Sequence, residues 1–249
     1  MQQYFLDEKF NSNSTYVLSK SDSNHIVKIM RKKNDDMVYV VFRDEIKYIC
    51  SIVDNNIEAV VVKPYKKVLG TNELTTKITI AIPPLKNDKI EYLIQKLTEL
   101  GVSSIVLFNS ERNIAKIKND KIESKLKRWR KIIKEAAEQS KRNLIPDIAY
   151  VDNLSELLNY SKLHDYKVVA YEKESINEEN INLKNLLTSD LDNKSVIAIF
   201  GSEGGLSEKE IDILTKSEFN VVGLGKRILR AETAPLYFIS CVAYFSEFK

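Results

Sequence analysis

Val196–Leu206, with the sequence VIAIFGSEGGL, is the stretch that decides the fold, because an apolar run leads there directly into a group of glycines. The run VIAIF is short and rich in β-branched residues, which is typical of a buried strand. Gly201, Gly204 and Gly205 follow in a chain that has only 7 glycines. Glycine is favoured where the backbone needs a positive φ or where a ligand approaches closely. The stretch therefore predicts a strand that ends in a binding loop.

A second glycine loop follows the next predicted strand, at Val221–Gly225 (VVGLG). It contains Gly223 and Gly225, so most of the chain's glycines lie between residues 201 and 225. In open α/β sheets, ligands bind in a crevice at the carboxyl ends of the strands. Two glycine loops at two such ends therefore predict a binding crevice. Tight turns without a ligand are the alternative.

The chemistry of the first loop argues against a phosphate ligand. GSEGGLSEKE lacks the GK[ST] of a P-loop and does not have the spacing GxGxxG. Glu203 inside the loop would repel a phosphate at close range, so the loop suits a neutral or cationic ligand better. Ser207–Glu210 (SEKE) is typical of a capping box that begins the next helix, which predicts a structural role for those residues.

Helices and strands alternate from about residue 73 to the end of the sequence. The predicted strands are 78–82, 104–108, 166–171, 195–200 and 221–222, and the predicted helices include 88–100, 121–142 and 231–248. This alternation predicts an α/β domain with a mostly parallel sheet.

The residues before this domain follow a different pattern. Alternating or apolar runs at 37–42, 46–52 and 59–62 predict short strands, and residues 24–31 predict a short helix. Several short strands with tight connections indicate a small β-barrel or sandwich. The polar stretch at 70–76 is the predicted boundary, which gives domains of residues 1–72 and 73–249.

Composition argues against several classes of protein. No run of about 18 apolar residues exists for a membrane span, and Asp7 and Glu8 precede any apolar signal segment. Cys50 and Cys241 stand far apart without a CxxC motif, so we expect neither a disulfide framework nor a metal site. The reducing cytoplasm is the expected location. Neither of the 2 histidines accompanies a nucleophile motif, which argues against acyl hydrolysis.

Positive charge is concentrated in one segment. The net charge of the chain is only +3, but residues 112–142 hold 12 Lys or Arg against 4 Asp or Glu. A single helical face collects the apolar positions of this segment, which are Ile122, Leu126, Trp129, Ile133 and Ala136. The basic remainder predicts a surface that contacts nucleic-acid phosphates. A solvated helix face in a lysine-rich protein is the alternative.

Two motifs together resemble those of the SPOUT class of methyltransferases. GSEGGLSEKEI begins at Gly201, and LGKRILRAETA begins at Leu224. Within the class the chain resembles the RsmE-type family, which methylates N3 of a uridine in small-subunit ribosomal RNA. That family usually shows GPEGGF followed by LGxRILRxETA. Ser202 and Leu206 depart from this pattern, where the family usually has proline and phenylalanine.

The resemblance extends beyond the two loops. Residues 110–146 are similar to a further family segment, with matches at Arg112, Trp129, Glu135, Gln139 and Arg142. The opening QQYFL also resembles the family's usual start. The similarity therefore touches the whole chain, strongly after residue 110 and weakly in residues 20–75.

This resemblance implies an architecture, a cofactor and an assembly. It implies an N-terminal PUA-like β-barrel that contacts RNA and a C-terminal SPOUT α/β domain with a trefoil knot. It also implies that three loops of the knot hold S-adenosyl-L-methionine and that two chains form a homodimer through the C-terminal helix. The residues implied to bind the methyl donor are Tyr171, Glu172, Phe200, Gly201, Glu203, Gly204, Gly205, Leu224, Gly225, Ile228, Leu229 and Thr233.

The implied reaction assigns roles to charged residues. Uridine N3 carries a proton at neutral pH, so either a base must remove the proton or the resulting anion must be stabilised. Arg230 is the first choice for stabilising the anion or orienting the base, and Arg227 and Arg112 are lesser candidates. Glu232 is placed either to take the proton or to hold its loop. The substrate is expected to be 16S ribosomal RNA, with contacts from Arg128, Gln139, Arg142 and Arg227.

Three alternatives stay open from the sequence. A SPOUT methyltransferase with another RNA target would carry the same donor motifs. An RNA-binding protein without activity would fail to bind S-adenosylmethionine. A nucleotide-binding α/β protein of another type would bind ATP or NAD.

Overall fold

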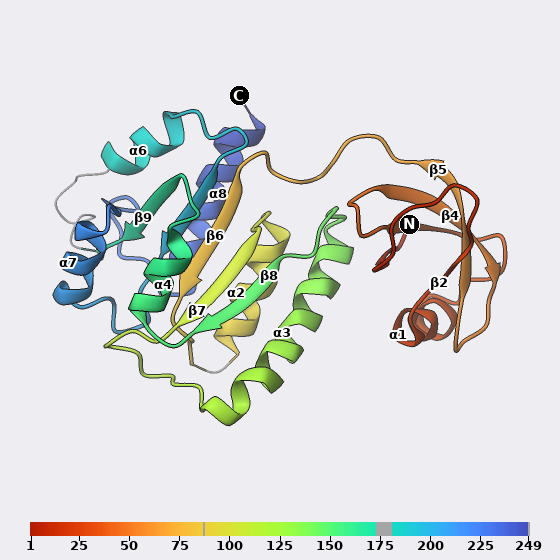
Figure 1. Cartoon of the computed structure of the whole chain (residues 1–249), viewed down its shortest axis with the longest axis horizontal. Coiled ribbons are helices and arrows are strands. Elements are labelled where there is room, and N and C mark those ends of the chain that lie inside the picture. Colours follow the sequence, from red (N-terminus) through yellow and green to blue (C-terminus); the bar gives the residue numbers. More distant parts are fainter. Residues whose placement is uncertain (87, 173–180, 249) are drawn as a thin grey trace. The chain divides into compact units, whose positions relative to one another are not determined.

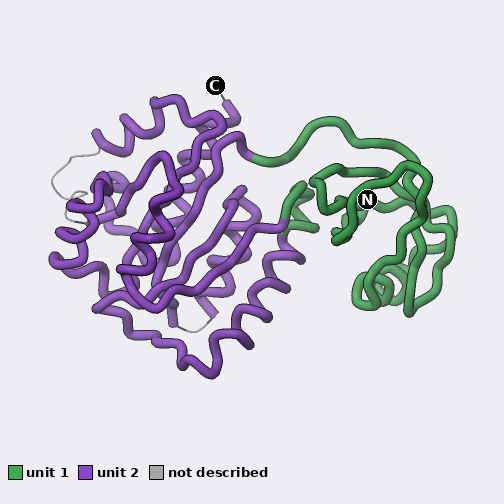
Figure 2. The backbone as a smooth tube through the Cα atoms, viewed as in Figure 1, with its two compact units in different colours: residues 1–73, 137–144 green, residues 74–136, 145–249 purple. Residues whose placement is uncertain are grey.

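The computed structural model describes residues 1–86, 88–172 and 181–248, which belong to two units (Figure 1). Unit 1 comprises Met1–Glu73 and Ala137–Leu144. Unit 2 comprises the described residues of Leu74–Ala136 and Ile145–Lys249 (Figure 2). The predicted boundary lies after residue 72, next to the end of the first stretch of unit 1. No pattern in the sequence predicted that residues 137–144 belong to unit 1.

Unit 1 contains a five-stranded mixed sheet. Its order is β1-β3-β4-β5-β2, and β1 runs parallel to β3 while the other pairs are antiparallel. The strands are β1 (Gln3–Phe5), β2 (Tyr16–Val17), β3 (Met37–Val41), β4 (Lys47–Asp54) and β5 (Val61–Lys67). A short helix, α1 (Lys20–Asn24), continues as the π-helical turn η1 (His25–Ile29). The core of the unit collects inward-facing side chains of these elements, including those of Tyr4, Ile26, Val38, Cys50 and Ile52.

Polar contacts attach residues 137–144 to the rest of unit 1. The Gln3 side chain donates a hydrogen bond of 2.7 Å to the carbonyl of Arg142. The Lys47 ammonium donates one of 2.6 Å to the carbonyl of Lys141. The guanidinium of Arg142 pairs with the carboxylate of Glu73, and both side chains are largely buried.

Unit 2 is built on a six-stranded sheet in which all strand pairs are parallel. The strand order is β11-β9-β10-β6-β7-β8. The strands are β6 (Lys77–Ile82), β7 (Ser104–Phe108), β8 (Asp147–Val151), β9 (Tyr166–Ala170), β10 (Ser195–Ile199) and β11 (Asn220–Val222). The helices are α2 (Lys89–Glu99), α3 (Asn119–Gln139), α4 (Leu154–Ser161), α6 (Ile181–Thr188), α7 (Glu208–Lys216) and α8 (Thr233–Glu247). The predicted α/β class with a mostly parallel sheet is confirmed.

Helices cover both faces of this sheet. Successive residues of a strand point to opposite faces, so Ile78, Ile80 and Ile82 share one face and Ala81 lies on the other. The first face packs against α2, α3, α6 and α8, and the second packs against α4 and α7 (Figure 1). A parallel sheet buried on both faces explains why its strands read as continuous apolar runs.

Among the described residues, no helix is both long and apolar enough to cross a membrane.

Candidate active site

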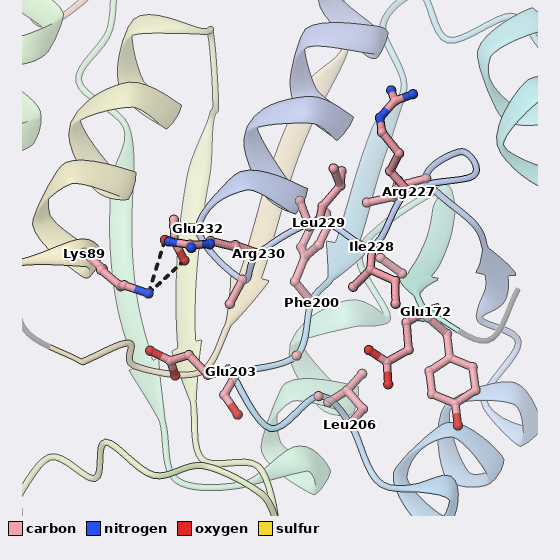
Figure 3. A pocket seen from close by; sticks show the side chains of 18 residues that line it. Lys89, Glu172, Phe200, Glu203, Leu206, Arg227, Ile228, Leu229, Arg230 and Glu232 are labelled. Carbon is pink, nitrogen blue, oxygen red and sulfur yellow. Dashed lines mark hydrogen bonds and ion pairs between the residues drawn. The ribbon is translucent and has the colours of Figure 1, made fainter. Parts of the chain in front are cut away.

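A pocket of about 400 Å³ lies at the carboxyl edge of the parallel sheet (Figure 3). Its walls come from the loops that follow β6, β9, β10 and β11, and these four strands are neighbours in the sheet. The carboxyl ends of parallel strands meet at one edge, so residues far apart in the sequence converge there. The volume falls within the usual range of small-molecule sites, roughly 300–1,000 Å³.

The structure brings most of the predicted site residues together in this pocket. Those that line it are Tyr171, Glu172, Phe200, Gly201, Glu203, Gly205, Leu224, Arg227, Ile228, Leu229, Arg230 and Glu232. The predicted residues that are not part of its lining are Arg112, Gly204, Gly225, Thr233 and the predicted RNA contacts Arg128, Gln139 and Arg142. Lining residues that were not among the predicted site residues are Lys89, Ala170, Ser202, Leu206, Ala231 and Ala234.

The loop after β10 needs two of its glycines for distinct reasons. A Cβ at Gly201 would lie 2.7 Å from the carbonyl carbon of Gly205, so the loop folds too tightly for any side chain there. Gly205 has a φ of +69°, which other residues rarely adopt. Its N–H donates a hydrogen bond of 2.9 Å to the carbonyl of Ser202, which closes the turn. The loop thus exposes backbone groups to the pocket.

Ser202 and Leu206, the two departures from the family pattern, are both buried. The Ser202 hydroxyl donates a hydrogen bond of 3.3 Å to the backbone carbonyl of Arg112. Leu206 packs into the core between the sheet and α7. The substitutions therefore keep the loop attached to its surroundings.

Arg112 contacts the same loop from outside the pocket. Its guanidinium donates a hydrogen bond of 3.4 Å to the carbonyl of Leu206, and its side chain is exposed. This placement favours a role in holding the loop, in place of the direct contact with reacting atoms that the sequence suggested.

The helix after the loop begins with the predicted capping box. The Ser207 hydroxyl accepts a hydrogen bond of 3.1 Å from the N–H of Glu210, and the Glu210 carboxylate accepts one of 2.8 Å from the N–H of Ser207. The same carboxylate accepts a further hydrogen bond from the N–H of Glu111. Both capping side chains are buried, so α7 begins at a fixed point directly after the pocket loop.

The third loop passes from β11 into α8. The carbonyl of Arg230 accepts hydrogen bonds from the N–H groups of Thr233 and Ala234, which starts the helix. Phe200 and Phe238 pack edge to face with 5.8 Å between ring centroids, and this contact joins the loop after β10 to α8. This contact fixes the two glycine loops to each other through α8, the helix that follows the second loop.

Lys89 and Glu232 form an ion pair in the wall of the pocket (Figure 3). The Lys89 ammonium lies 3.1 Å from one carboxylate oxygen of Glu232 and 3.2 Å from the other. Burial alone would raise the pKa of Glu232. A backbone hydrogen bond, the Lys89 ammonium and the charge of Arg230 outweigh it, so the pKa of Glu232 lies below its ordinary value. The carboxylate is therefore ionised at neutral pH.

The residues predicted to contact RNA have different surroundings. Arg128 and Gln139 are exposed on α3, although Arg128 also pairs with Glu91. Arg227 lies exposed at the pocket, and in Figure 3 its guanidinium points away from Lys89 and Glu232. Arg142 is only 2% exposed and its guanidinium is engaged by Glu73, which favours a structural role over contact with RNA.

Comparison with known proteins places this site in a family. A family model described as an RNA methyltransferase domain matches residues 72–243. The chain is 35% identical to the ribosomal RNA small subunit methyltransferase E of Bacillus subtilis, over 99% of this chain and 98% of that protein.

Solved structures share the fold over nearly the whole chain. The ribosomal RNA small subunit methyltransferase E of Neisseria gonorrhoeae, bound to S-adenosyl methionine, is 24% identical with a TM-score of 0.83, over 96% of this chain and 95% of that chain. A protein from Legionella pneumophila in complex with the cofactor SAM is 26% identical with a TM-score of 0.82, over 96% of each chain. With its motifs, its pocket and these full-length matches, the chain belongs to the ribosomal RNA small subunit methyltransferase E family.

Proposed function

We propose that this protein transfers a methyl group from S-adenosyl-L-methionine to N3 of a uridine in the 16S ribosomal RNA of the small ribosomal subunit. The observation that carries the proposal is the convergence of three loops on one pocket. Those loops follow β9, β10 and β11, and they are the ones that the family resemblance implied for the donor. Full-length relatives named for this RNA support the substrate.

The lining of the pocket fits the methyl donor. Apolar side chains such as Leu206, Leu224 and Leu229 offer contact to an adenosine, and the folded glycine loop offers backbone donors and acceptors. Glu172 and Glu203 bring negative charge to a ligand that carries a sulfonium cation. When bound, the donor supplies a methyl group that is already activated by the positive charge on sulfur.

The protein's own contribution is positioning and control of charge. Arg230 lines the pocket close enough to Glu232 for its charge to lower that carboxylate's pKa. We assign its guanidinium to stabilising the uridine anion that forms when N3 loses its proton to solvent water. The N3 lone pair then forms the bond to the methyl carbon as the carbon–sulfur bond breaks, and the electron pair of that bond stays on sulfur.

RNA contact is assigned to the exposed basic residues near this edge of unit 2 and on α3. Arg227 lies at the pocket, and Arg128 is two-thirds exposed on α3. Phosphate contacts of this kind release counterions, so binding of the RNA should weaken as salt rises.

The first test is calorimetric titration of the protein with S-adenosylmethionine, with ATP and NAD as controls. Selective binding of the methyl donor is the expected result. Absence of donor binding by the folded protein would favour an RNA-binding protein without activity, and binding of ATP or NAD would favour another nucleotide-binding protein.

The second test identifies the RNA. Small subunits from a strain that lacks the gene should accept a labelled methyl group on one uridine, and subunits from the parent strain should not. Label on a different nucleotide would keep the donor chemistry and overturn the uridine assignment.

The proposal includes a homodimer joined through α8, located in the cytoplasm. Tyr244 near the end of α8 and Phe248 directly after it are 61% and 72% exposed, and their rings lie 5.6 Å apart between centroids, so they form an exposed apolar pair. Cys50 and Cys241 are free thiols, which suits a reducing compartment. Light scattering during gel filtration should give twice the mass of one chain, and Tyr244→Glu should give a single-chain mass.

A further inference from the structure

Lys89 occupies an unfavourable position for a cation. It is the first residue of α2, where the unpaired N–H groups and the helix dipole give a positive potential. Acidic side chains are preferred at such a position, and Glu91 in the same turn follows that preference. A lysine there needs a compensating partner, and the structure supplies one from a loop more than a hundred residues away in the sequence.

That partner, Glu232, is held through both carboxylate oxygens. The ammonium of Lys89 lies at 3.1 Å and 3.2 Å from them, so one cation bridges the whole carboxylate (Figure 3). The Glu232 side chain is only 16% exposed and that of Lys89 is 37% exposed. Water therefore screens the pair much less than it screens an ordinary surface ion pair.

The other charged groups of the pocket show what the pair does there. The charged residues that line it are Lys89, Glu172, Glu203, Arg227, Arg230 and Glu232. Of these, Lys89 from α2 and Arg230 from the loop before α8 are the two whose charge lowers the pKa of Glu232. Glu232 thus stands as a partly buried anion between the helix after β6 and the arginine assigned to the reaction.

We propose that Lys89 is a positioning residue for methyl transfer, which holds Glu232 as a fixed anion that orients Arg230. This inference rests on the proposed function. Because both oxygens of Glu232 are engaged, the carboxylate is a poor proton acceptor and a good anchor. Without Lys89, the pKa of Glu232 rises and the carboxylate is no longer held through both oxygens, so Arg230 loses a fixed anion beside it.

The first test measures Glu232 directly in the protein without donor or RNA. Carbon-13 NMR of labelled glutamate carboxyl groups, with the Glu232 signal identified by its absence in Glu232→Gln, gives the pKa of this group. In Lys89→Met the pKa should rise, and in Lys89→Arg it should stay low. An unchanged titration in Lys89→Met would overturn the inference, whatever the activity of the protein.

The second test measures the reaction. At neutral pH, Lys89→Met should lower kcat by about 10–100-fold, by analogy with residues that orient a ligand-contacting side chain. The affinity for S-adenosylmethionine should change little, the acid limb of the pH profile should move to higher pH, and Lys89→Arg should restore most of the rate. Lys96→Met is the matched control, because Lys96 lies on the same helix and pairs with Glu99 outside the pocket.

The two failures are distinguishable. If the wild-type protein methylates no uridine N3, the proposed function fails, and the NMR titration still decides the contact between Lys89 and Glu232. If the wild-type protein is active and Lys89→Met has the same rate and pH profile, the positioning role fails alone.

Discussion

Two arginines three positions apart face different tasks at the same pocket. Arg230 lies beside the partly buried carboxylate of Glu232, whereas the guanidinium of Arg227 points away from it (Figure 3). Arg230→Ala should lower kcat by about 10²–10³-fold, as expected for loss of one stabiliser of developing negative charge, and leave donor affinity nearly unchanged. Arg227→Ala should mainly raise the KM for RNA. Equal kinetics for the two variants would contradict this division of roles, and single-turnover methyl transfer measures it.

Gly201→Ala tests whether the loop after β10 must bring residues 201 and 205 into direct backbone contact. In Gly201→Ala the new Cβ would meet the backbone of Gly205 at 2.7 Å, and backbone atoms cannot move aside as a flexible side chain can. Overpacking of this kind costs about 1–3 kcal/mol. If that cost falls on the donor loop, affinity for S-adenosylmethionine drops by roughly tenfold to a hundredfold in calorimetry. Gly70→Ala is the control for a strained glycine outside the pocket loops: its φ of +82° means that the substitution should lower Tm, but donor affinity should stay unchanged.

Individual residues of the site were predictable to different degrees. Glycine is scarce in this chain, so Gly201 and Gly205 carried a strong signal. Lys89 carried none, because its partner Glu232 is found only once α2 and α8 are known to pack against each other. Arg142 had a family match and a basic context, but its burial depends on Glu73, which no local pattern reveals.

At the scale of single elements, the capping box at the start of α7 fixes the end of the pocket loop that precedes it. Ser207→Ala removes one half of the capping box and leaves the N–H of Glu210 without its side-chain acceptor. Loss of such a cap costs about 1 kcal/mol, or about 2–4 °C in Tm for a chain of this size. Thermal unfolding measures the effect, and Ser207→Thr should retain most of the stability. A Tm equal to that of the wild type would show that the cap contributes nothing.

The connection between α4 and β9 contains a pH-sensitive group. Burial lowers the pKa of His164 below its ordinary value near 6.5, and its Nε2 lies 2.9 Å from the hydroxyl of Thr79. The unfolded chain therefore binds a proton at a higher pH than the folded one, so stability is lost as pH falls below about 6.5. His164→Gln cannot take up this proton, and its Tm should change less between pH 7.5 and pH 5.5. If the Tm of the wild type and of His164→Gln fell by the same amount between these two pH values, the assignment would be contradicted.

Element prediction succeeded where a pattern was long or strongly apolar. The strands β7 and β10 are fully or almost fully buried and were predicted nearly to their ends. The strands β1 and β2 have three and two residues, too few for an alternating pattern. The strand β8 was missed because DIAYV is short and half-exposed, and because it directly follows a proline.

At the scale of the whole molecule, the pair of Glu73 and Arg142 fixes the second stretch of unit 1. The side chains are 12% and 3% exposed, and the Glu73 carboxylate also accepts a hydrogen bond of 2.7 Å from the N–H of Asn143. Glu73→Ala removes a carboxylate that pairs with the buried guanidinium of Arg142, which costs about 3–5 kcal/mol. Denaturant unfolding measures this loss. Glu58→Ala, which breaks an exposed pair with Lys20, should cost about 1 kcal/mol or less.

The division of the chain was only partly visible in its sequence. The polar stretch near residue 72 is visible because a strand-rich pattern precedes it and an alternation of strands and helices follows it. The return of residues 137–144 is not visible, because α3 keeps one helical pattern while its last turn belongs to unit 1. The trefoil knot implied by the family resemblance stays a prediction, since threading of the chain leaves no local signal.

The shared last turn of α3 also sets an order of events during protein synthesis. Unit 1 needs residues 137–144 to complete its contacts with Gln3, Glu45 and Lys47. A ribosome that adds about 5–20 residues per second needs on the order of ten seconds to extend the chain from residue 73 to residue 144. During that interval the nascent strands of unit 1 wait for their final segment, while the first strands of unit 2 are already being made. The N-terminal unit of this chain can thus be completed only after part of unit 2 has been translated.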